Sequence, residues 1–235
     1  MQRLGPDVTD VLSFNDPFTL FLIAVAGVLL AGYGLGRWVN RRRAQIISAW
    51  LEPGLRALGG HPVARPLNRS AFRVKVTQAR SPYATLSVSV VLLSREVLPV
   101  WLLERLRRRQ DVLFWHIKWR QPPKVEAEVI DANNELGRRG ESVARQLGWM
   151  PGNPSGTWHV YGPSAAAMAR AQAMAQLLTE QGVTFWRLAV RKEEPHLLLS
   201  MPLPEPRRTS SGQLVAALGR LSKLALDAVP EAESL

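Results

Sequence analysis

The side chains that most often carry chemistry are few and scattered in this chain of 235 residues. Four histidines, His61, His116, His159 and His196, are the candidates for acid–base catalysis or metal binding. They lie far apart, none falls in a helix at the spacing that a metal site uses, and no HExxH, GxSxG or GxxxxGK[ST] motif occurs. The chain has no cysteine, which excludes disulfides, thiol nucleophiles and cysteine-ligated metals. We therefore expect a non-enzymatic protein without a cofactor, a metal or a small-molecule substrate.

Arginine is the residue whose clustering points to a ligand. Between residues 37 and 120 there are seventeen Lys or Arg against four Asp or Glu, whereas residues 121–235 contain twelve of each. A basic half suits phosphate, which anionic lipid headgroups and RNA both carry, so charge leaves these two ligands open. The predicted contacts with phosphate, lipid or ribosome are the arginines of two clusters: Arg41, Arg42 and Arg43, and Arg105, Arg107, Arg108 and Arg109.

An uncharged apolar segment, residues 17–36, precedes the first arginine cluster. Twenty helical residues span about 30 Å, which is the thickness of a hydrocarbon core. A helix also satisfies its own backbone where water is absent. We expect a retained, single-pass transmembrane helix here, because a cleaved signal peptide would carry its positive charge before a shorter apolar stretch.

The charges on the two sides of this segment predict its orientation. Residues 1–16 contain one Arg against three Asp, whereas Arg37 and the first arginine cluster crowd the other side. The positive-inside rule places residues 1–16 outside the cell, as a short extracytoplasmic N-terminus, and the C-terminal domain in the cytoplasm. The lack of cysteine fits that reducing compartment.

A pair of glycines inside the apolar segment could allow close helix packing. Gly32 and Gly36 form a GxxxG step, which lets two membrane helices approach each other. Glycine is also common in membrane helices without such a role. The two glycines are the predicted contact with a membrane-helix partner, and a step without a partner is the alternative.

The rest of the chain predicts the α+β domain that has to position these residues. Residues 37–67 are expected to form a basic juxtamembrane helix and a Gly- and Pro-rich hinge, residues 68–228 the cytosolic domain, and residues 229–235 a frayed tail. The predicted order in the domain is β-β-α-β-β-(α)-β-α-β-β-α. Because strand, strand and helix recur in both halves, one domain and two packed units, 68–148 and 157–228, remain alternatives.

Alternation and helical spacing predict the individual elements. The predicted strands are 72–78, 83–93, 112–119, 125–130, 157–161, 184–191 and 196–201, and the predicted helices are 40–58, 95–110, 134–148, 164–181 and 212–227. Trp115 and Trp119 fall on the apolar side of their strand, which favours core packing over base stacking. Glu126 and Glu128 are expected to pair with Lys118 across neighbouring strands.

Two segments contain the basic clusters. They are RRRAQIISAWLEPGLRAL at 41–58, with Ala44-Gln45 followed by Trp50, and VVLLSREVLPVWLLERLRRRQDVL at 90–113, with Arg109-Gln110-Asp111. After the apolar segment, the two resemble the calumin-like family of coiled-coil-domain membrane proteins, which belong to the intramembrane chaperone complex of the multipass translocon in the endoplasmic reticulum. Further on, HLLLSMPLP at 196–204 is similar to the closing strand of that family's cytosolic domain.

The resemblance implies a cytosolic α+β domain that binds a small membrane partner and shelters polar membrane helices near the ribosome. The chain lacks the family's long acidic luminal region and its long charged C-terminal coiled coil. A compact relative in a prokaryotic plasma membrane is therefore expected, rather than a protein of the endoplasmic reticulum.

These observations predict a non-enzymatic, single-pass membrane protein that assists membrane-protein insertion or assembly as a factor associated with a translocon or chaperone. The alternative is a membrane-tethered basic module that binds RNA or anionic lipid. The expected partners are the membrane and a small membrane protein or translocon component, and contact with the ribosome or RNA is left open.

Overall fold

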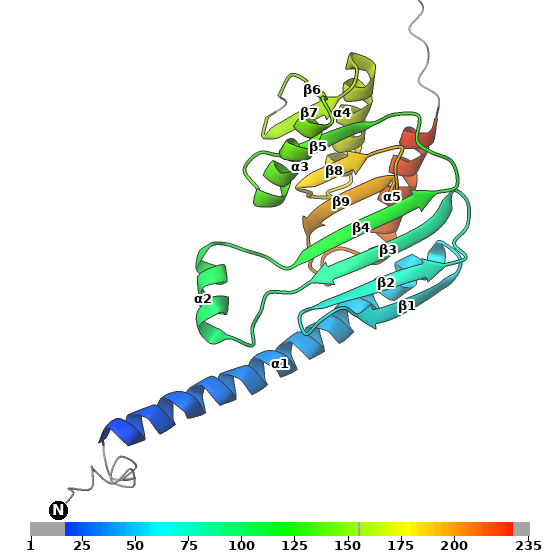
Figure 1. The fold of residues 1–235 in the computed structure, drawn as a ribbon. Helices are drawn as coiled ribbons and strands as arrows, with labels where there is room; N and C mark the ends of the chain where they lie inside the picture. The colour runs from blue at the N-terminus through cyan, green and yellow to red at the C-terminus, as the bar shows by residue number, and fades with distance from the viewer. Residues whose placement is uncertain (1–16, 155, 228–235) are drawn as a thin grey trace, which may run out of the picture. The chain divides into compact units, whose positions relative to one another are not determined.

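The computed structural model describes residues 17–154 and 156–227, which fold as two compact units (Figure 1). The first unit holds the described residues up to Arg43 together with residues 93–109, and the second holds the remainder. The predicted extracytoplasmic N-terminus, 1–16, and the predicted tail, 229–235, lie outside the described residues.

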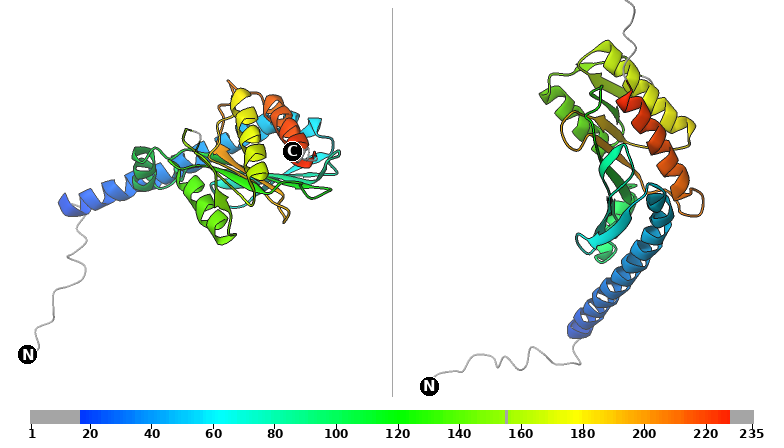
Figure 2. Two further views of the ribbon diagram at one scale, coloured as in Figure 1. Left: turned by 90° about the horizontal axis from the view of Figure 1, so that it is seen from above. Right: turned by 90° about the vertical axis from the view of Figure 1, so that its right-hand side faces the viewer.

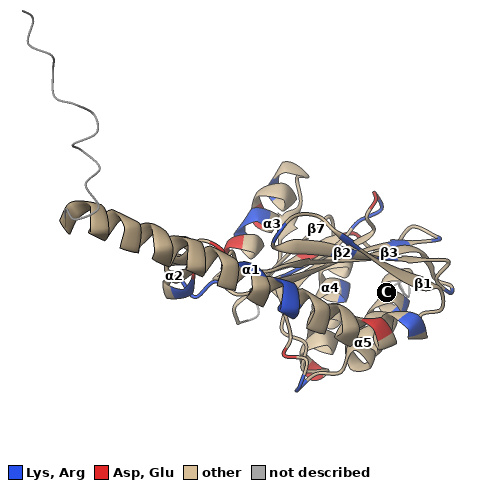
Figure 3. Cartoon of the chain, turned by 90° about the horizontal axis from the view of Figure 1, so that it is seen from below, with Lys and Arg blue, Asp and Glu red and all other residues tan. Residues whose placement is uncertain are grey.

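Helix α1, Pro17–Ala57, contributes to both units and joins the two helices that the sequence predicts at 17–36 and 40–58. It is long and apolar enough to cross a membrane, and 6% of its most apolar window is buried inside the protein. A core helix of a soluble protein would bury most of that window. Lys and Arg appear in α1 only after this apolar part (Figure 3).

The second unit is built on one antiparallel sheet of nine strands, in the order β1-β2-β3-β4-β9-β8-β5-β7-β6. The strands are β1 His61–Pro66, β2 Ala71–Thr77, β3 Tyr83–Val91, β4 Val112–Trp119, β5 Ala127–Asp131, β6 Met150–Pro151, β7 Trp158–Gly162, β8 Arg187–Val190 and β9 Leu197–Pro202. The mixed α+β class is confirmed, but the predicted order is not. Strand β1 occupies the segment that was expected to be a hinge, and the two-residue β6 falls between predicted elements.

Four shorter helices follow α1, namely α2 Leu98–Leu106, α3 Glu135–Gln146, α4 Ala165–Glu180 and α5 Ser211–Leu226. The side chains of Asn134, Ser164 and Ser210 accept hydrogen bonds from the first-turn amides of α3, α4 and α5, so local sequence defines these starts. Helix α2 is shorter than the predicted 95–110 helix, and its N-cap residue Val97 offers no side-chain cap.

The main core lies on one face of the sheet. Trp115 and Trp119, both fully buried, pack there with apolar residues of α4, α5 and the C-terminal part of α1. This confirms the prediction that both tryptophans are core residues. Helix α3 packs on the opposite face, where Ile130, Ala144 and Tyr161 form a separate small cluster. Figure 2 shows α4 and α5 on one side of the sheet and α3 on the other.

The distal strands share one sheet with the first strands, because β9 pairs with β4. Strands β9 and β8 therefore lie between β4 and β5, and the predicted pairing of Lys118 with Glu126 and Glu128 is wrong. Lys118 instead forms an ion pair with Glu194. Glu128 pairs with arginines of β8 and the turn after it, and Glu126 accepts from the Lys192 amide at 3.0 Å.

Candidate functional site

One face of the sheet unit is left largely uncovered by helices. Helix α3 is the helix on this face, and its contacts with the sheet are to β5, β7 and β8. We call the outward side chains of β1, β2, β3, β4 and β9 the open face. These five strands contain no Asp or Glu at all, whereas their outward side chains include Arg65, Arg73, Lys75 and Lys118.

The strand register places cations and rings in the same rows across the open face. Arg73 lies opposite Ser89, which lies opposite Phe114 on the next strand. In the neighbouring row, Lys75 lies opposite Ser87, which lies opposite His116. Strands are spaced about 4.8 Å apart, so each ring lies roughly 10 Å from the backbone that carries the cation of its row.

The rings of Phe114 and His116 form the aromatic centre of the open face. Their centroids are 6.4 Å apart, their planes are tilted by 37°, and both side chains are partly exposed. Burial, and secondly the positive charge of Arg73, lower the pKa of His116 below its usual value, so this imidazole is neutral at pH 7. The face therefore offers two uncharged rings beside fixed cations.

Three cations of the open face have no acidic neighbour. Among the described residues, no carboxylate lies within ion-pair distance of Arg65, Arg73 or Lys75, and Arg73 donates from Nε to the Ser89 hydroxyl at 2.9 Å. The α3-covered end of the same sheet differs, because the buried carboxylate of Glu128 there neutralises two arginines. The unbalanced positive charge thus lies on β1 and β2.

The predicted arginine clusters both lie in the first unit. Arg41, Arg42 and Arg43 are exposed on α1, and the Arg42 guanidinium lies 5.4 Å from the Trp38 ring centroid. At the end of α2, Arg105, Arg107, Arg108 and Arg109 are exposed as well, and Arg109 lies 3.8 Å from Glu104. Their predicted contacts with phosphate, lipid or ribosome remain predictions.

The predicted partner face of the apolar helix α1 is in contact with residues 95–98 of the same chain. A Cβ added to Gly32 would collide with the Leu98 side chain, and one added to Gly36 would collide with the Arg95 carbonyl. Nearby, the buried Asn40 donates to the Leu93 carbonyl at 3.1 Å and accepts from Arg95 at 2.9 Å. The two glycines therefore allow the α2 segment to lie closely against α1, and a membrane-helix partner at the same step stays a prediction.

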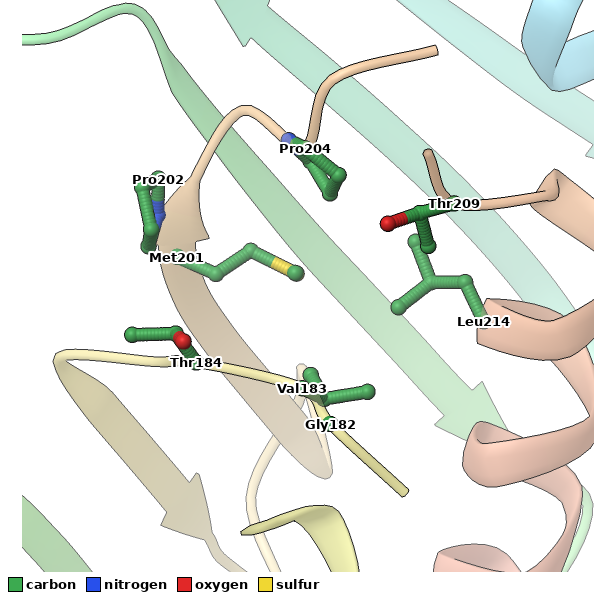
Figure 4. Close-up of a pocket in the computed structure, with 8 residues that line it drawn as sticks. All are labelled: Gly182, Val183, Thr184, Met201, Pro202, Pro204, Thr209 and Leu214. Atoms are coloured by element: carbon green, nitrogen blue, oxygen red, sulfur yellow. The ribbon is translucent and has the colours of Figure 1, made fainter. Parts of the chain in front are cut away.

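A small pocket of about 150 Å³ lies elsewhere in the sheet unit (Figure 4). Its lining consists of Gly182, Val183, Thr184, Met201, Pro202, Pro204, Thr209 and Leu214. None of these side chains ionises, and two threonine hydroxyls are its polar side-chain groups, so the pocket offers no acid–base chemistry. In the part of the chain that the structure describes, no group of three His, Asp or Glu residues is placed to hold a metal ion.

Sequence reasoning missed the open face, although its signal is present in strand β2. Arg73 and Lys75 alternate with the buried Phe72, Val74 and Val76, which fixes them on the outer side. What the alternation does not show is that the four neighbouring strands carry no acidic residue on the same side. That property depends on strand order, which brings β9 next to β4.

The chain matches no protein-family model, and a search of curated proteins finds no match either.

Proposed function

We propose that this protein is a non-enzymatic, single-pass membrane protein whose cytoplasmic open face binds single-stranded RNA. The observation that carries the proposal is an acid-free sheet face in which Arg73 and Lys75 lie in the same rows as the Phe114 and His116 rings. Aromatic side chains on a basic sheet are the general means by which proteins stack and hold unpaired bases.

The rings favour RNA over anionic lipid as the ligand of this face. A phospholipid headgroup would use the cations but has no aromatic surface to stack on Phe114 or His116. A single strand would use both, with phosphates on the cations and bases on the rings. The negative N-terminus and the arginines after the apolar segment predict a cytoplasmic sheet, and the cytoplasm is the compartment that holds ribosomes and their RNA.

Assistance of membrane-protein insertion is the second candidate function. A face that holds RNA, tethered to a helix that is long and apolar enough to cross a membrane, suits a factor that works beside membrane-bound ribosomes. The resemblance to calumin-like proteins supports the same role. Crosslinking in native membranes would test it, and recovery of neither ribosomes nor nascent membrane proteins would exclude it.

The RNA proposal is tested by binding of a fluorescent, unstructured 12-nucleotide RNA to the full chain in nanodiscs of zwitterionic lipid. Two variants remove different features of the open face. The double substitution Arg73→Gln/Lys75→Gln removes charge, and Phe114→Leu removes one ring while keeping an apolar side chain. We expect each to weaken binding at least fivefold, since one stacked base is worth about 1–3 kcal/mol.

A matched control removes the same charge elsewhere. Arg138 on α3 and Lys223 on α5 are both exposed and lie outside the open face, so Arg138→Gln/Lys223→Gln is expected to change affinity less than twofold. Equal losses in the control and the open-face variants would refute the proposed site. Binding of anionic vesicles by the open face, without binding of RNA, would replace RNA by lipid as its ligand.

A further inference from the structure

Helix α2 exposes an apolar stripe that no described element of its own unit covers. None of its residues is buried, and Leu102, Leu103 and Leu106 are 54%, 48% and 73% exposed. At 100° per residue these three leucines fall within an arc of about 100°, the usual width of the apolar face of an amphipathic helix. Trp101 and Glu104, on the opposite side of the helix, are partly buried. The exposed leucines are therefore an ordered face of α2 rather than scattered surface residues.

The contact between α2 and α1 defines the depth at which α2 begins, one turn before the stripe, relative to the apolar segment. Leu98, the first residue of α2, lies against Gly32. Gly32 is one helical turn before Gly36, and Gly36 is the last residue of the uncharged stretch. Four helical residues correspond to about 6 Å along the axis. Helices that lie in a membrane interface bury their apolar face about 5–10 Å into the headgroup and acyl boundary. The α2 segment thus meets the membrane helix at the depth of an interfacial helix.

Positive charge gathers where such a helix would meet phosphate groups. Arg105 precedes the last leucine of the stripe, and Arg107, Arg108 and Arg109 follow it directly. Arg108 has φ = 54°, a left-handed conformation that usually belongs to glycine after a helix. This conformation costs a side chain roughly 1 kcal/mol or more, so local folding alone would favour glycine here.

We propose that α2 is a second membrane contact, which lies in the interface of the cytoplasmic leaflet with its leucine stripe among acyl chains and its arginines on anionic lipid phosphates. The inference rests on the membrane anchorage of the proposed function and not on its RNA-binding face. Lipid is the occupant because the stripe adjoins the membrane helix at the boundary depth, and because the adjacent arginines complement anionic headgroups.

The cysteine-free chain allows single labelled cysteines to measure depth in liposomes of phosphatidylcholine with 30% phosphatidylglycerol. Leu102→Cys and Leu106→Cys report on the stripe, Val25→Cys near the middle of the apolar segment provides the reference for the hydrocarbon core, and Ser142→Cys on the exposed surface of α3 provides the aqueous reference. Each carries an environment-sensitive fluorophore. We expect labels at the stripe to be protected from an aqueous quencher several-fold better than the label at Ser142, and to be quenched by lipids that carry a shallow acyl-chain quencher.

The possible outcomes separate the inference from the proposal on which it rests. Aqueous exposure of the Val25 label would overturn the membrane anchorage itself, whereas exposure of the stripe labels alone would overturn the inference. Protection that disappears when the protein is diluted to one copy per vesicle would assign the stripe to a second copy of the chain. Protection in native membranes but not in liposomes would assign it to a protein partner, and either result overturns the lipid contact.

Arg108→Gly separates charge from folding. Glycine relieves the left-handed backbone, so the variant should be at least as stable as the parent chain. If the arginines hold anionic lipid, the same variant should lower the preference of the stripe label for phosphatidylglycerol about fivefold, which corresponds to about 1 kcal/mol per arginine. An unchanged dependence on anionic lipid in this variant and in Arg105→Gln/Arg107→Gln would overturn the role of the arginines.

Discussion

The salt dependence of RNA binding provides a quantitative test of the open face. Each cation that neutralises a phosphate releases counterions, and the logarithm of the association constant falls against the logarithm of salt with a slope of about −0.7 per contact on a single strand. Arg65, Arg73 and Lys75 are the three cations of this face without a carboxylate partner, whereas Lys118 is paired with Glu194. Three contacts predict a slope of about −2.

This slope gives a definite loss of affinity. Raising monovalent salt from 50 to 200 mM should weaken binding of the 12-nucleotide RNA about 20-fold for the parent chain. Arg73→Gln/Lys75→Gln leaves one unpaired cation, so its slope should fall to about −0.7 and the same change of salt should weaken binding about threefold. Fluorescence anisotropy in zwitterionic nanodiscs over four salt concentrations measures both slopes.

The ring variant gives the complementary result. Phe114→Leu removes a stacking surface and no charge, so its binding curve should shift to weaker affinity at every salt concentration with an unchanged slope. A slope near −2 in Arg73→Gln/Lys75→Gln would show that the counterions are released at another surface. That result, or a changed slope in Phe114→Leu, would refute the assignment of charge to β2 and of stacking to β4.

Three further predictions concern stability and are checked by thermal unfolding of the full chain in nanodiscs. Glu128→Gln removes a fully buried carboxylate whose two arginine partners are partly exposed, and should lower the free energy of unfolding by about 2–4 kcal/mol. A decrease below about 0.5 kcal/mol would contradict a stabilising role of these two ion pairs. Ser222→Ala leaves the buried indole N–H of Trp119 without its acceptor at 3.1 Å and should lower the free energy of unfolding by about 1–3 kcal/mol. An unchanged melting temperature would show that another acceptor replaces the Ser222 hydroxyl. Burial lowers the pKa of His116 and His196 below 6.5, so the unfolded chain binds more protons than the folded chain in weak acid. The free energy of unfolding should therefore be highest above about pH 6.5 and should decrease as the pH falls towards the folded pKa values. The decrease should be smaller in His116→Gln.

The sequence predicts most of the elements because they have strong local signals. Twenty uncharged residues indicate the apolar helix, and the alternation in β4 correctly places Trp115 and Trp119 in the core. Strand β1 was missed because Pro62 and Pro66 are typical of a loop. The structure shows that an edge strand tolerates them, since pairing with β2 alone leaves half of its backbone unpaired.

The pairing of strands that are distant in the sequence could not be predicted from local sequence patterns. Nothing in the alternation of β9 indicates that it pairs with β4, yet this pairing separates Lys118 from Glu128 and completes the open face. In the first unit, Gly32 and Gly36 lie against a segment of the same chain, and the predicted contact with a membrane-helix partner stays a prediction. Spacing could not identify the approaching segment as residues 95–98 of the same chain, because a GxxxG step has the same sequence whichever backbone packs on it.

The two ends of the sheet affect how the membrane-anchored protein that we propose would behave when many copies crowd one membrane. Strand β1 at one end has prolines at two of its six positions, and β6 at the other end is two residues long and includes Pro151. Proline has no amide hydrogen to offer a neighbouring strand, and a very short strand is a poor template for further pairing. Lateral growth of the sheet from molecule to molecule is thereby discouraged at both borders. Diffusion in two dimensions can then bring copies into frequent collision without seeding fibres.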